Sequence, residues 1–373
     1  ATGAKLLCGL GGSLDVFAGV VERARAYLAG APCEPVAPRC AATVMLVSVE
    51  NVNYRLYLAM EENPRVTIVK GEEPVFCLKA VKNPVEIANT KNAHIKEGVA
   101  MARLQMCLEE KLAVGETVSE TDVGELLVDF RKEQEGYMED SFAVIAAYGA
   151  NAAMMHYHPT PENHAVLQRK GFLLLDTGGQ YVDGTTDTTR TYALGELTDE
   201  ERRYYTYVLK ANIGIARTVF MEGCSGANLD IMSRTQIWKY GLDYRCGTGH
   251  GVGFVGPIHE GPQSLRMTNH VPFQPGMTIT DEPGIYEEGL VGVRIENELL
   301  VVEHMETKYG KFYAFQPITY LPIDTTPVVL ELMNEEEISW LNDYHQMVYD
   351  TLSPRMTERE RIWLKEKTKP LEK

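Results

Sequence analysis

The sequence predicts an α+β fold, in which helices and antiparallel hairpins occupy different stretches of a 373-residue chain. Segments with apolar residues at helical spacing follow recognisable capping residues, which indicates helices. Segments rich in β-branched and aromatic residues indicate strands, and several are joined by glycine-containing turns. The two kinds of segment do not alternate one by one, as they would around a parallel sheet, so we expect α+β rather than α/β.

The helical segments are predicted from their caps. Asn83 caps a helix with Pro84 in its first turn, which runs to Leu112, and a second helix starts near Ser119 and passes Phe130. A capping box of Thr198 and Glu201 precedes a helix over 204–220, and a further helix covers 228–240. In the tail we expect an amphipathic helix over 334–349 and a short one after a second capping box, formed by Thr357 and Glu360.

Strands are predicted at 41–58, 65–69, 142–147, 172–176, 181–194, 277–280 and 292–302. The first forty residues fit no clear pattern, although 15–28 could form a helix, and three prolines between Ala31 and Arg39 indicate a linker.

Composition restricts the possible partners. The formal net charge is −16, which argues against a nucleic-acid backbone or an anionic membrane as the main partner. No apolar stretch approaches the length of a membrane span, and the N-terminus carries no pattern of a secretion signal. We therefore expect neither nucleic acid nor membrane as a partner.

The seven cysteines are scattered, odd in number and without a Cys-x-x-Cys pair. This pattern favours reduced thiols over a disulfide framework or a structural zinc site, and it predicts a cytoplasmic protein.

The candidate site consists of one imidazole and four carboxylates. Each lies in a glycine-rich or β-rich stretch that could direct it at a common point: Asp176, Asp187, His250, Glu282 and Glu296. Asp187 follows Asp176 by eleven residues across a glycine-containing turn, a spacing that suits two adjacent antiparallel strands. Either aspartate alone could equally be an ordinary turn or N-cap residue, and His250, among four glycines, could be a surface histidine of a flexible loop.

Glu296 has two interpretations. Apolar Val293, Ile295 and Leu299 alternate with Arg294, Glu296 and Glu298 along the predicted strand. The charged set could be a solvated face, or Glu296 could be a metal ligand with Arg294 as its partner. Periodicity does not decide between them.

Cations would resolve the repulsion among these groups. Four like charges in one pocket require neutralisation, and two divalent ions would balance about −4 and activate a water molecule. Oxygen-rich ligation with one nitrogen suits manganese, iron, cobalt or zinc, and the residue types do not select among these.

The five motifs, in this order and spacing, resemble the pita-bread metallopeptidases, the superfamily of methionine aminopeptidase, prolidase and aminopeptidase P. The chain is most similar to Xaa-Pro aminopeptidases (aminopeptidase P) of the long, cytosolic, dimeric form. The resemblance extends from about Val44 to the C-terminus. It includes Leu78-Lys-Ala-Val-Lys-Asn83, Ala93-His-Ile-Lys96, Ile338-Ser-Trp-Leu-Asn-Asp-Tyr-His345 and Trp363-Leu364.

The resemblance implies a role for each site residue. Asp176 would bind one metal with both oxygens, Asp187 and Glu296 would bridge the two metals, and His250 and Glu282 would complete the coordination of the second metal. Catalytic and substrate-binding roles are implied for two histidines, His156 and His259. Tyr286 and Arg294 would line the substrate site. Cys246 stands where many relatives have a further active-site histidine.

The resemblance also implies an activity. A hydroxide bridging two divalent ions, with manganese expected and zinc or cobalt as alternatives, would attack the bond before proline while Glu282 acts as general base. The N-terminal residue would be released from peptides with proline in second position. A prolidase that cuts only Xaa-Pro dipeptides, and a non-catalytic peptide-binding or partner-binding relative, are the alternatives.

A domain organisation and a homodimer are implied as well. Residues 1–40 are unassigned, 41–79 would be the remnant of a preceding α/β domain, 80–325 the pita-bread catalytic domain and 326–373 a C-terminal helical extension. The N-terminal region is thus truncated relative to the long form.

Overall fold

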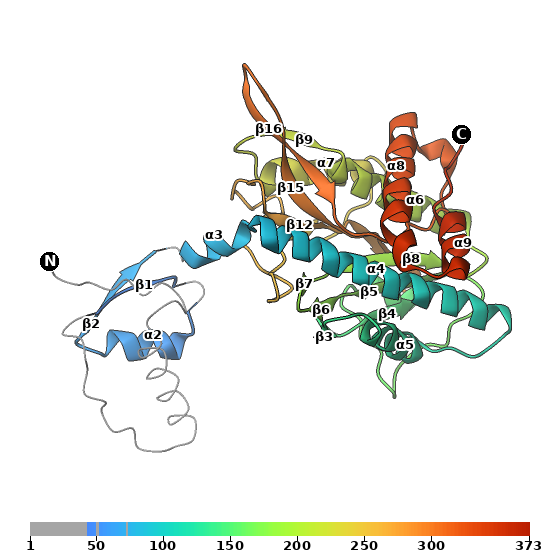
Figure 1. The fold of residues 1–373 in the computed structure, drawn as a ribbon, viewed down its shortest axis with the longest axis horizontal. Helices are drawn as coiled ribbons and strands as arrows, with labels where there is room; N and C mark the ends of the chain where they lie inside the picture. The colour runs from blue at the N-terminus through green and yellow to red at the C-terminus, as the bar shows by residue number, and fades with distance from the viewer. Residues whose placement is uncertain (1–42, 50–51, 72–73) are drawn as a thin grey trace. The chain divides into compact units, whose positions relative to one another are not determined.

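The computed structural model describes residues 43–49, 52–71 and 74–373. They divide into two compact units with the boundary between Lys79 and Ala80. In the first unit, strands β1 (Thr43–Val47) and β2 (Val66–Lys70) pair in parallel and helix α2 (Tyr54–Glu61) connects them (Figure 1). The helix predicted at 15–28 lies outside the described residues.

The expectation of a continuous β-rich segment over 41–58 is wrong in its second half. Residues from Tyr54 onward are helical, because the Asn53 side chain accepts a hydrogen bond from the Arg55 N–H at 3.0 Å and caps the helix. The aromatic and aliphatic residues of this segment are common in strands, but strand propensity depends strongly on context, and here the segment follows a helix cap.

The second unit begins with two long helices at the capping residues that the sequence predicts. The short helix α3 (Pro74–Ala80) ends at the boundary between the units, and α4 (Pro84–Ala113) begins at a capping box of Asn83 and Glu86. Helix α5 (Glu120–Lys132) starts at the capping box of Ser119 and Asp122 and packs against α4. Helix α5 also packs against strand β4 (Ile145–Tyr148) of a first sheet.

This first sheet is antiparallel and three-stranded, in the order β4, β5 (Phe172–Thr177), β8 (Thr188–Ala193). A smaller sheet of β3 (Tyr137–Asp140), β6 (Gly179–Tyr181) and β7 (Gly184–Thr185) lies beside it in sequence. The strand predicted over 181–194 is therefore interrupted, because Val182 and Asp183 form the turn between β6 and β7, and Gly184, the first residue of β7, has a φ of 154°. A 3₁₀ turn, η1 (Gly149–Ala153), follows β4.

The second half carries α6 (Asp199–Ala216), α7 (Gly226–Trp238) and a four-stranded sheet, β12-β15-β16-β9. Its strands are β9 (Val219–Met221), β12 (Thr278–Asp281), β15 (Asn297–Thr307) and β16 (Gly310–Pro317). Two short hairpin pairs complete it: β10 (Gly249–His250) with β11 (Ser264–Leu265), and β13 (Gly284–Glu287) with β14 (Val291–Arg294).

Two boundaries differ from the sequence prediction. Helix α6 starts right after its Thr198 cap and ends at Ala216, so that Val219 and Phe220 join the sheet as β9. The strand predicted at 292–302 is two strands, since Ile295 and Glu296 lie in the break between β14 and β15.

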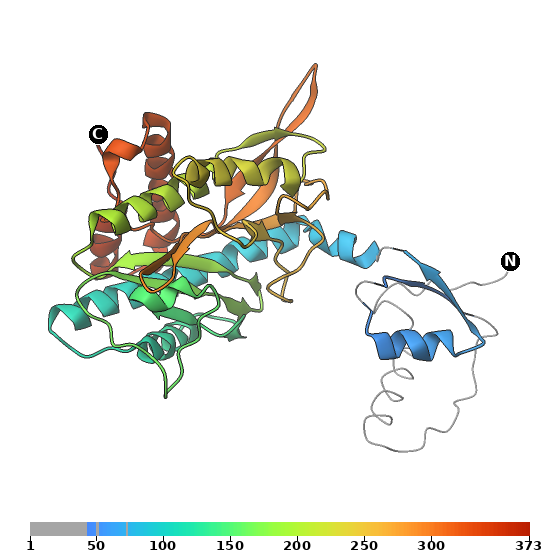
Figure 2. The same ribbon diagram turned by 180° about the vertical axis from the view of Figure 1, so that it is seen from behind.

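Two C-terminal helices, α8 (Glu335–Leu352) and α9 (Glu358–Lys367), pack on α4, and Figures 1 and 2 show them side by side. The β15–β16 hairpin extends away from the other strands in both views. The main apolar core joins these layers, with Leu104, Phe172, Tyr205, Val293 and Leu341 each at most 1% exposed. Among the described residues, no helix is both long enough and apolar enough to cross a membrane.

Candidate metal centre

The two aspartates come from neighbouring antiparallel strands, as the eleven-residue spacing predicts. Strands β5 and β8 pair with Asp176 opposite Thr189, and Asp187 immediately precedes β8. Both carboxylates are largely buried, with 9% of Asp176 and 4% of Asp187 exposed. Neither aspartate therefore lies on a solvent-exposed turn.

His250 is held by its backbone and by one ring nitrogen. Strand β10 approaches β12 so closely that a Cβ on Gly249 would lie 1.8 Å from the Thr280 carbonyl oxygen, so only glycine fits there. The His250 N–H donates to the Thr280 hydroxyl at 3.0 Å, and Nδ1 lies 3.0 Å from the Gly251 carbonyl oxygen. Because a carbonyl only accepts, Nδ1 carries a proton, which leaves the Nε2 lone pair of the neutral ring for a metal.

The two glutamates follow β12 and β14. Glu282 comes directly after β12, where its Oε1 accepts from the Thr280 hydroxyl at 3.2 Å. Glu296 lies in the break between β14 and β15, where its N–H donates to the Thr189 carbonyl at 3.1 Å and its Oε2 accepts from the Thr189 hydroxyl at 2.8 Å. Only 1% of Glu296 is exposed, which excludes the interpretation of a solvated face.

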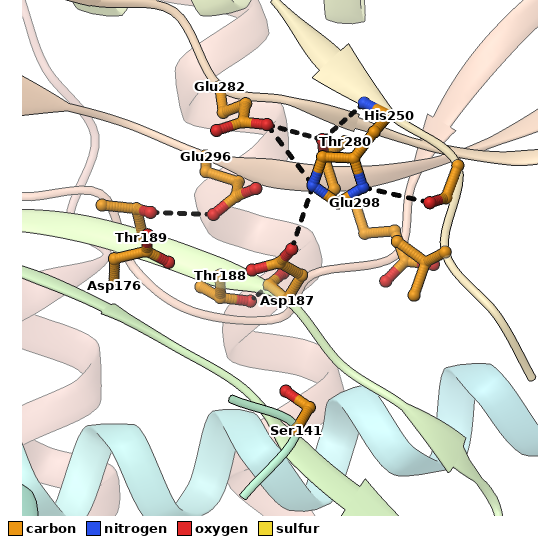
Figure 3. A network of polar contacts seen from close by, with 12 residues as sticks. Ser141, Asp176, Asp187, Thr188, Thr189, His250, Thr280, Glu282, Glu296 and Glu298 are labelled. Atoms are coloured by element: carbon orange, nitrogen blue, oxygen red, sulfur yellow. Dashed lines mark hydrogen bonds and ion pairs between the residues drawn. The ribbon is translucent and has the colours of Figure 1, made fainter. Parts of the chain in front are cut away.

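These side chains converge from separate elements (Figure 3). Asp187, His250 and Glu296 each offer one ligand atom within 4.8 Å of the others. The His250 Nε2 atom lies 3.3 Å from Asp187 Oδ2 and 3.4 Å from Glu282 Oε1. Nitrogen and carboxylate oxygens in this arrangement fit a divalent transition ion.

Asp176 has a different immediate partner. Its Oδ2 accepts from the Arg294 guanidinium at 2.5 Å, while its Oδ1 is buried and has no hydrogen-bond partner among the described residues. Arg294 also donates to the Tyr286 hydroxyl at 2.8 Å and to the Thr189 hydroxyl at 3.1 Å. An orphaned buried carboxylate oxygen costs free energy unless a cation or proton meets it, so Asp176 also fits a metal ligand.

The protein alone does not neutralise the cluster. Burial and the neighbouring Asp176 and Glu282 raise the pKa of Asp187 to about 7 despite its contact with His250. Burial and the same neighbours also raise the pKa of Glu296 well above its ordinary value, and burial with Asp176 raises the pKa of Glu282. Burial lowers the pKa of His250, but Asp187 and Glu282 outweigh it and raise this pKa to about 9. Without metal, the proposed ligands thus retain protons that bound cations would displace.

The two further predicted histidines differ in how firmly the structure ties them to the centre. The His259 ring meets the His250 ring edge to face with centroids 4.2 Å apart, and burial together with His250 and His156 lowers the pKa of His259. His156 is exposed and follows the η1 turn. Of the two, His259 is the one in direct ring contact with a proposed ligand, His250.

Cys246 is half-buried, and burial together with Glu282 raises the pKa of its thiol to about 11. The thiol is therefore protonated at neutral pH, which does not suit a nucleophile. The described cysteines Cys77, Cys107, Cys224 and Cys246 are all free.

Sequence reasoning did not find Thr189, Thr280 or Arg190. The Thr189 and Thr280 hydroxyls orient Glu296, His250 and Glu282, and the Arg190 guanidinium donates to the Glu296 carbonyl at 2.6 Å. The Thr-Thr-Arg run after Asp187 was visible in the sequence, but its contacts lie more than a hundred residues away.

The comparisons with known proteins identify the class of protein. Residues 88–303 match the family described as Metallopeptidase family M24, and residues 311–371 match the C-terminal region of peptidase M24. The chain therefore belongs to metallopeptidase family M24 and has the α+β pita-bread fold with a C-terminal helical region, as expected.

Within that class, the chain is similar to aminopeptidases P. It is 41% identical over 309 residues to Aminopeptidase P2 of Arabidopsis thaliana, covering 81% of this chain and 43% of that protein. It is 41% identical over 306 residues to a probable Xaa-Pro aminopeptidase P of Coprinopsis cinerea, covering 80% and 49%. The chain thus spans about half the length of these curated relatives.

Solved structures of X-prolyl peptidases are similar to this chain as well. An X-prolyl aminopeptidase from Caenorhabditis elegans, described as a cytosolic enzyme with a di-nuclear active site, superposes with a TM-score of 0.82 at 31% identity over 96% of this chain and 57% of that one. An Xaa-Pro dipeptidase from Bacillus anthracis superposes with a TM-score of 0.63 at 28% identity, covering 76% and 73%.

Proposed function

We propose that this chain releases the N-terminal residue from peptides with proline in second position, using two divalent metal ions. The observation that carries the proposal is the convergence of Asp187, His250 and Glu296 within 4.8 Å, beside Glu282 and the orphaned oxygen of Asp176. The resemblance to named Xaa-Pro aminopeptidases supports the choice of substrate.

The five proposed ligands are Asp176, Asp187, His250, Glu282 and Glu296. Bound ions would supply Lewis acidity toward the scissile carbonyl and toward water. We propose manganese, with zinc or cobalt as alternatives, because four carboxylates and one imidazole form an oxygen-rich donor set.

Glu282 is proposed as the general base. Its carboxylate is the one that the Thr280 hydroxyl orients toward His250, and its raised pKa brings it nearer to the range in which a carboxylate exchanges protons at neutral pH. It would hold the proton taken from water and return it to the prolyl nitrogen as the peptide bond breaks.

His156, His259, Tyr286 and Arg294 are proposed to bind the substrate. His259 has a lowered pKa and lies against His250, so as a neutral donor it would stabilise negative charge on the carbonyl oxygen. Arg294 fixes Tyr286 and Asp176 together, which would hold one wall of the substrate site rigid.

The proposal is tested with metal-stripped protein and two peptides, Arg-Pro-Pro and Arg-Pro, with and without added manganese. Cleavage of the tripeptide only with metal supports the aminopeptidase. Cleavage of the dipeptide alone replaces it with prolidase. Failure to cleave either peptide while the protein takes up manganese contradicts the catalytic proposal and favours a non-catalytic binding protein.

We also propose a cytoplasmic homodimer. The cytosolic description of the Caenorhabditis elegans relative and the free thiols support this location. Light scattering on the purified chain tests the dimer, and a monomeric mass at micromolar concentration contradicts it.

A further inference from the structure

The Arg190 guanidinium is fully buried behind the metal centre and connects it to the C-terminal region. Its five N–H groups reach six acceptors at 2.6 to 3.0 Å, so that Nε, Nη1 and Nη2 all donate and one Nη2 hydrogen is shared between two acceptors. A buried cation with this many partners holds them in one fixed arrangement.

Three of the six bonds fix the main chain around Glu296. Nη1 donates to the Glu296 carbonyl at 2.6 Å and to the Thr189 carbonyl at 2.9 Å, and Nη2 donates to the Asn297 side chain at 2.9 Å. Glu296 and Thr189 are also bonded to each other, through the Glu296 N–H and through the Thr189 hydroxyl. Arg190 thus locks the strand break that aims the Glu296 carboxylate.

The other three bonds reach the segment that leads into α8 and α8 itself. Nε donates to the Pro322 carbonyl at 3.0 Å, and Nη2 donates to the Leu321 carbonyl and the Tyr344 hydroxyl, both at 2.8 Å. The Tyr344 hydroxyl in turn lies 3.1 Å from Asn297 Oδ1, so Tyr344 contacts both Arg190 and the residue after Glu296.

Tyr344 is itself held in place. Only 3% of it is exposed, and its ring stacks on Trp340 with centroids 5.4 Å apart. Its hydroxyl also lies 2.9 Å from the Thr319 and Leu321 carbonyls. A single hydroxyl on α8 therefore closes a network between the C-terminal region and the Glu296 backbone.

This network can hold the ligands in position when no metal is bound. Asp187, His250 and Glu296 offer ligand atoms within 4.8 Å of one another, and Glu282 Oε1 lies 3.4 Å from His250 Nε2. When these carboxylates are ionised and no cation is bound, they repel one another. If the main chain at Glu296 could move, the carboxylates would separate, and part of the free energy of metal binding would be used in bringing them together again. A fixed main chain avoids this cost by preorganisation.

We propose that Tyr344 is a positioning residue for metal binding, acting through Arg190 and Asn297 on the main chain of Glu296. The C-terminal region would then set the affinity of the centre for metal from α8, without contacting metal or substrate. This inference rests on the metal centre of the proposed function.

The test compares Tyr344→Phe with a matched control, Tyr205→Phe, by calorimetric titration of manganese. The Tyr205 hydroxyl is also buried and donates to a carbonyl of the same connecting segment, that of Asp324 at 2.6 Å, but its described hydrogen bond does not include Arg190 or Asn297. Both variants lose one buried hydroxyl of the same kind, so a general loss of stability affects both.

We expect manganese affinity to fall about tenfold in Tyr344→Phe, as for other partners that orient ligands, and less than twofold in Tyr205→Phe. Equal affinities in the two variants overturn the inference while leaving the metal centre intact. If the unchanged chain binds no manganese, the proposed function and this inference both fail.

Arg190→Lys provides a second variant, because lysine keeps the charge but has three donors in place of a fork. We expect its manganese affinity to fall at least as far as that of Tyr344→Phe. An affinity equal to that of the unchanged chain, in folded Arg190→Lys protein, contradicts the proposed route through Arg190.

Discussion

The two ends of the acidic centre solve the same electrostatic problem differently. At one end, Asp187, Glu282 and Glu296 surround His250, and their raised pKa values mean that protons or added cations must neutralise them. At the other end, Asp176 is already paired with the Arg294 guanidinium. One end depends on what binds from solution, whereas the protein supplies part of the neutralising charge at the other.

The comparison also separates the residues that govern metal binding from those that govern substrate binding. Arg294 bonds one oxygen of Asp176 and leaves the other orphaned, so Asp176 is half satisfied without metal. The Asp187 end has no such cation of its own apart from protonated His250, whose Nε2 is also the proposed metal-binding atom. Metal loading should therefore depend chiefly on the Asp187 end and substrate handling chiefly on the Arg294 end.

The largest expected effect comes from removing the Asp187 carboxylate. Asp187→Ala should abolish metal binding and hydrolysis together, with a loss of hydrolysis well beyond the roughly 100-fold typical of residues that only support a ligand. Calorimetry with manganese and a peptide assay measure the two losses. Hydrolysis retained by Asp187→Ala protein after rigorous removal of metal contradicts the dimetal assignment.

Glu282→Gln should lower hydrolysis by about 100-fold to 10,000-fold, because the amide cannot accept a proton. The neighbouring Asp281 offers a matched control. It is fully buried, neither of its side-chain oxygens has a hydrogen-bond partner among the described residues, and burial raises its pKa well above the ordinary value, which favours the neutral form that an amide resembles. Asp281→Asn should therefore change hydrolysis less than about threefold, and comparable losses in the two variants contradict the assigned role of Glu282.

Arg294→Gln tests the other end. Without the guanidinium, Asp176 and Tyr286 lose their shared partner, and we expect kcat/KM for an Xaa-Pro peptide to fall about 10-fold to 100-fold. Manganese binding at the Asp187 end should change less than in Asp187→Ala protein. If Arg294→Gln abolishes metal binding as Asp187→Ala does, the two ends are not separate.

The smallest expected effect concerns pH. In metal-free protein the pKa of Asp187 is raised to about 7 and that of His250 to about 9, so folding takes up protons at both sites. Their contribution to stability is present at low pH and is lost as pH rises through these values. The unfolding temperature of metal-free protein should fall by several degrees between about pH 5 and pH 9. Saturating manganese should reduce this fall, and an identical pH profile with metal indicates that the ion binds elsewhere.

Local sequence signals predicted much of the fold. The capping boxes of Asn83, Thr198 and Thr357 begin α4, α6 and α9 as expected, because a cap depends only on residues three apart. The spacing of Asp176 and Asp187 predicted the antiparallel pairing of β5 and β8 correctly.

What the sequence left open depends on contacts between distant residues. Alternation around Glu296 could not distinguish a solvated face from a site, and the structure buries both sets because Arg294, Glu296 and Glu298 point into the protein. The partners of Arg190 lie as far away as Tyr344, 154 residues along the chain, and no local pattern marks such a pairing. Segment 54–58 was misassigned because its strand-forming residues follow a helix cap, Asn53, whose side chain accepts a hydrogen bond from the Arg55 N–H.

The position of Tyr344 in the chain has a consequence for biosynthesis. A ribosome makes Asp176, Asp187, His250, Glu282 and Glu296 before it makes Tyr344. Domains fold in part during synthesis, so the nascent chain holds every proposed ligand before the residue that steadies one of them. Ions acquired early in translation would therefore be held weakly, and firm retention would follow only after α8 has docked.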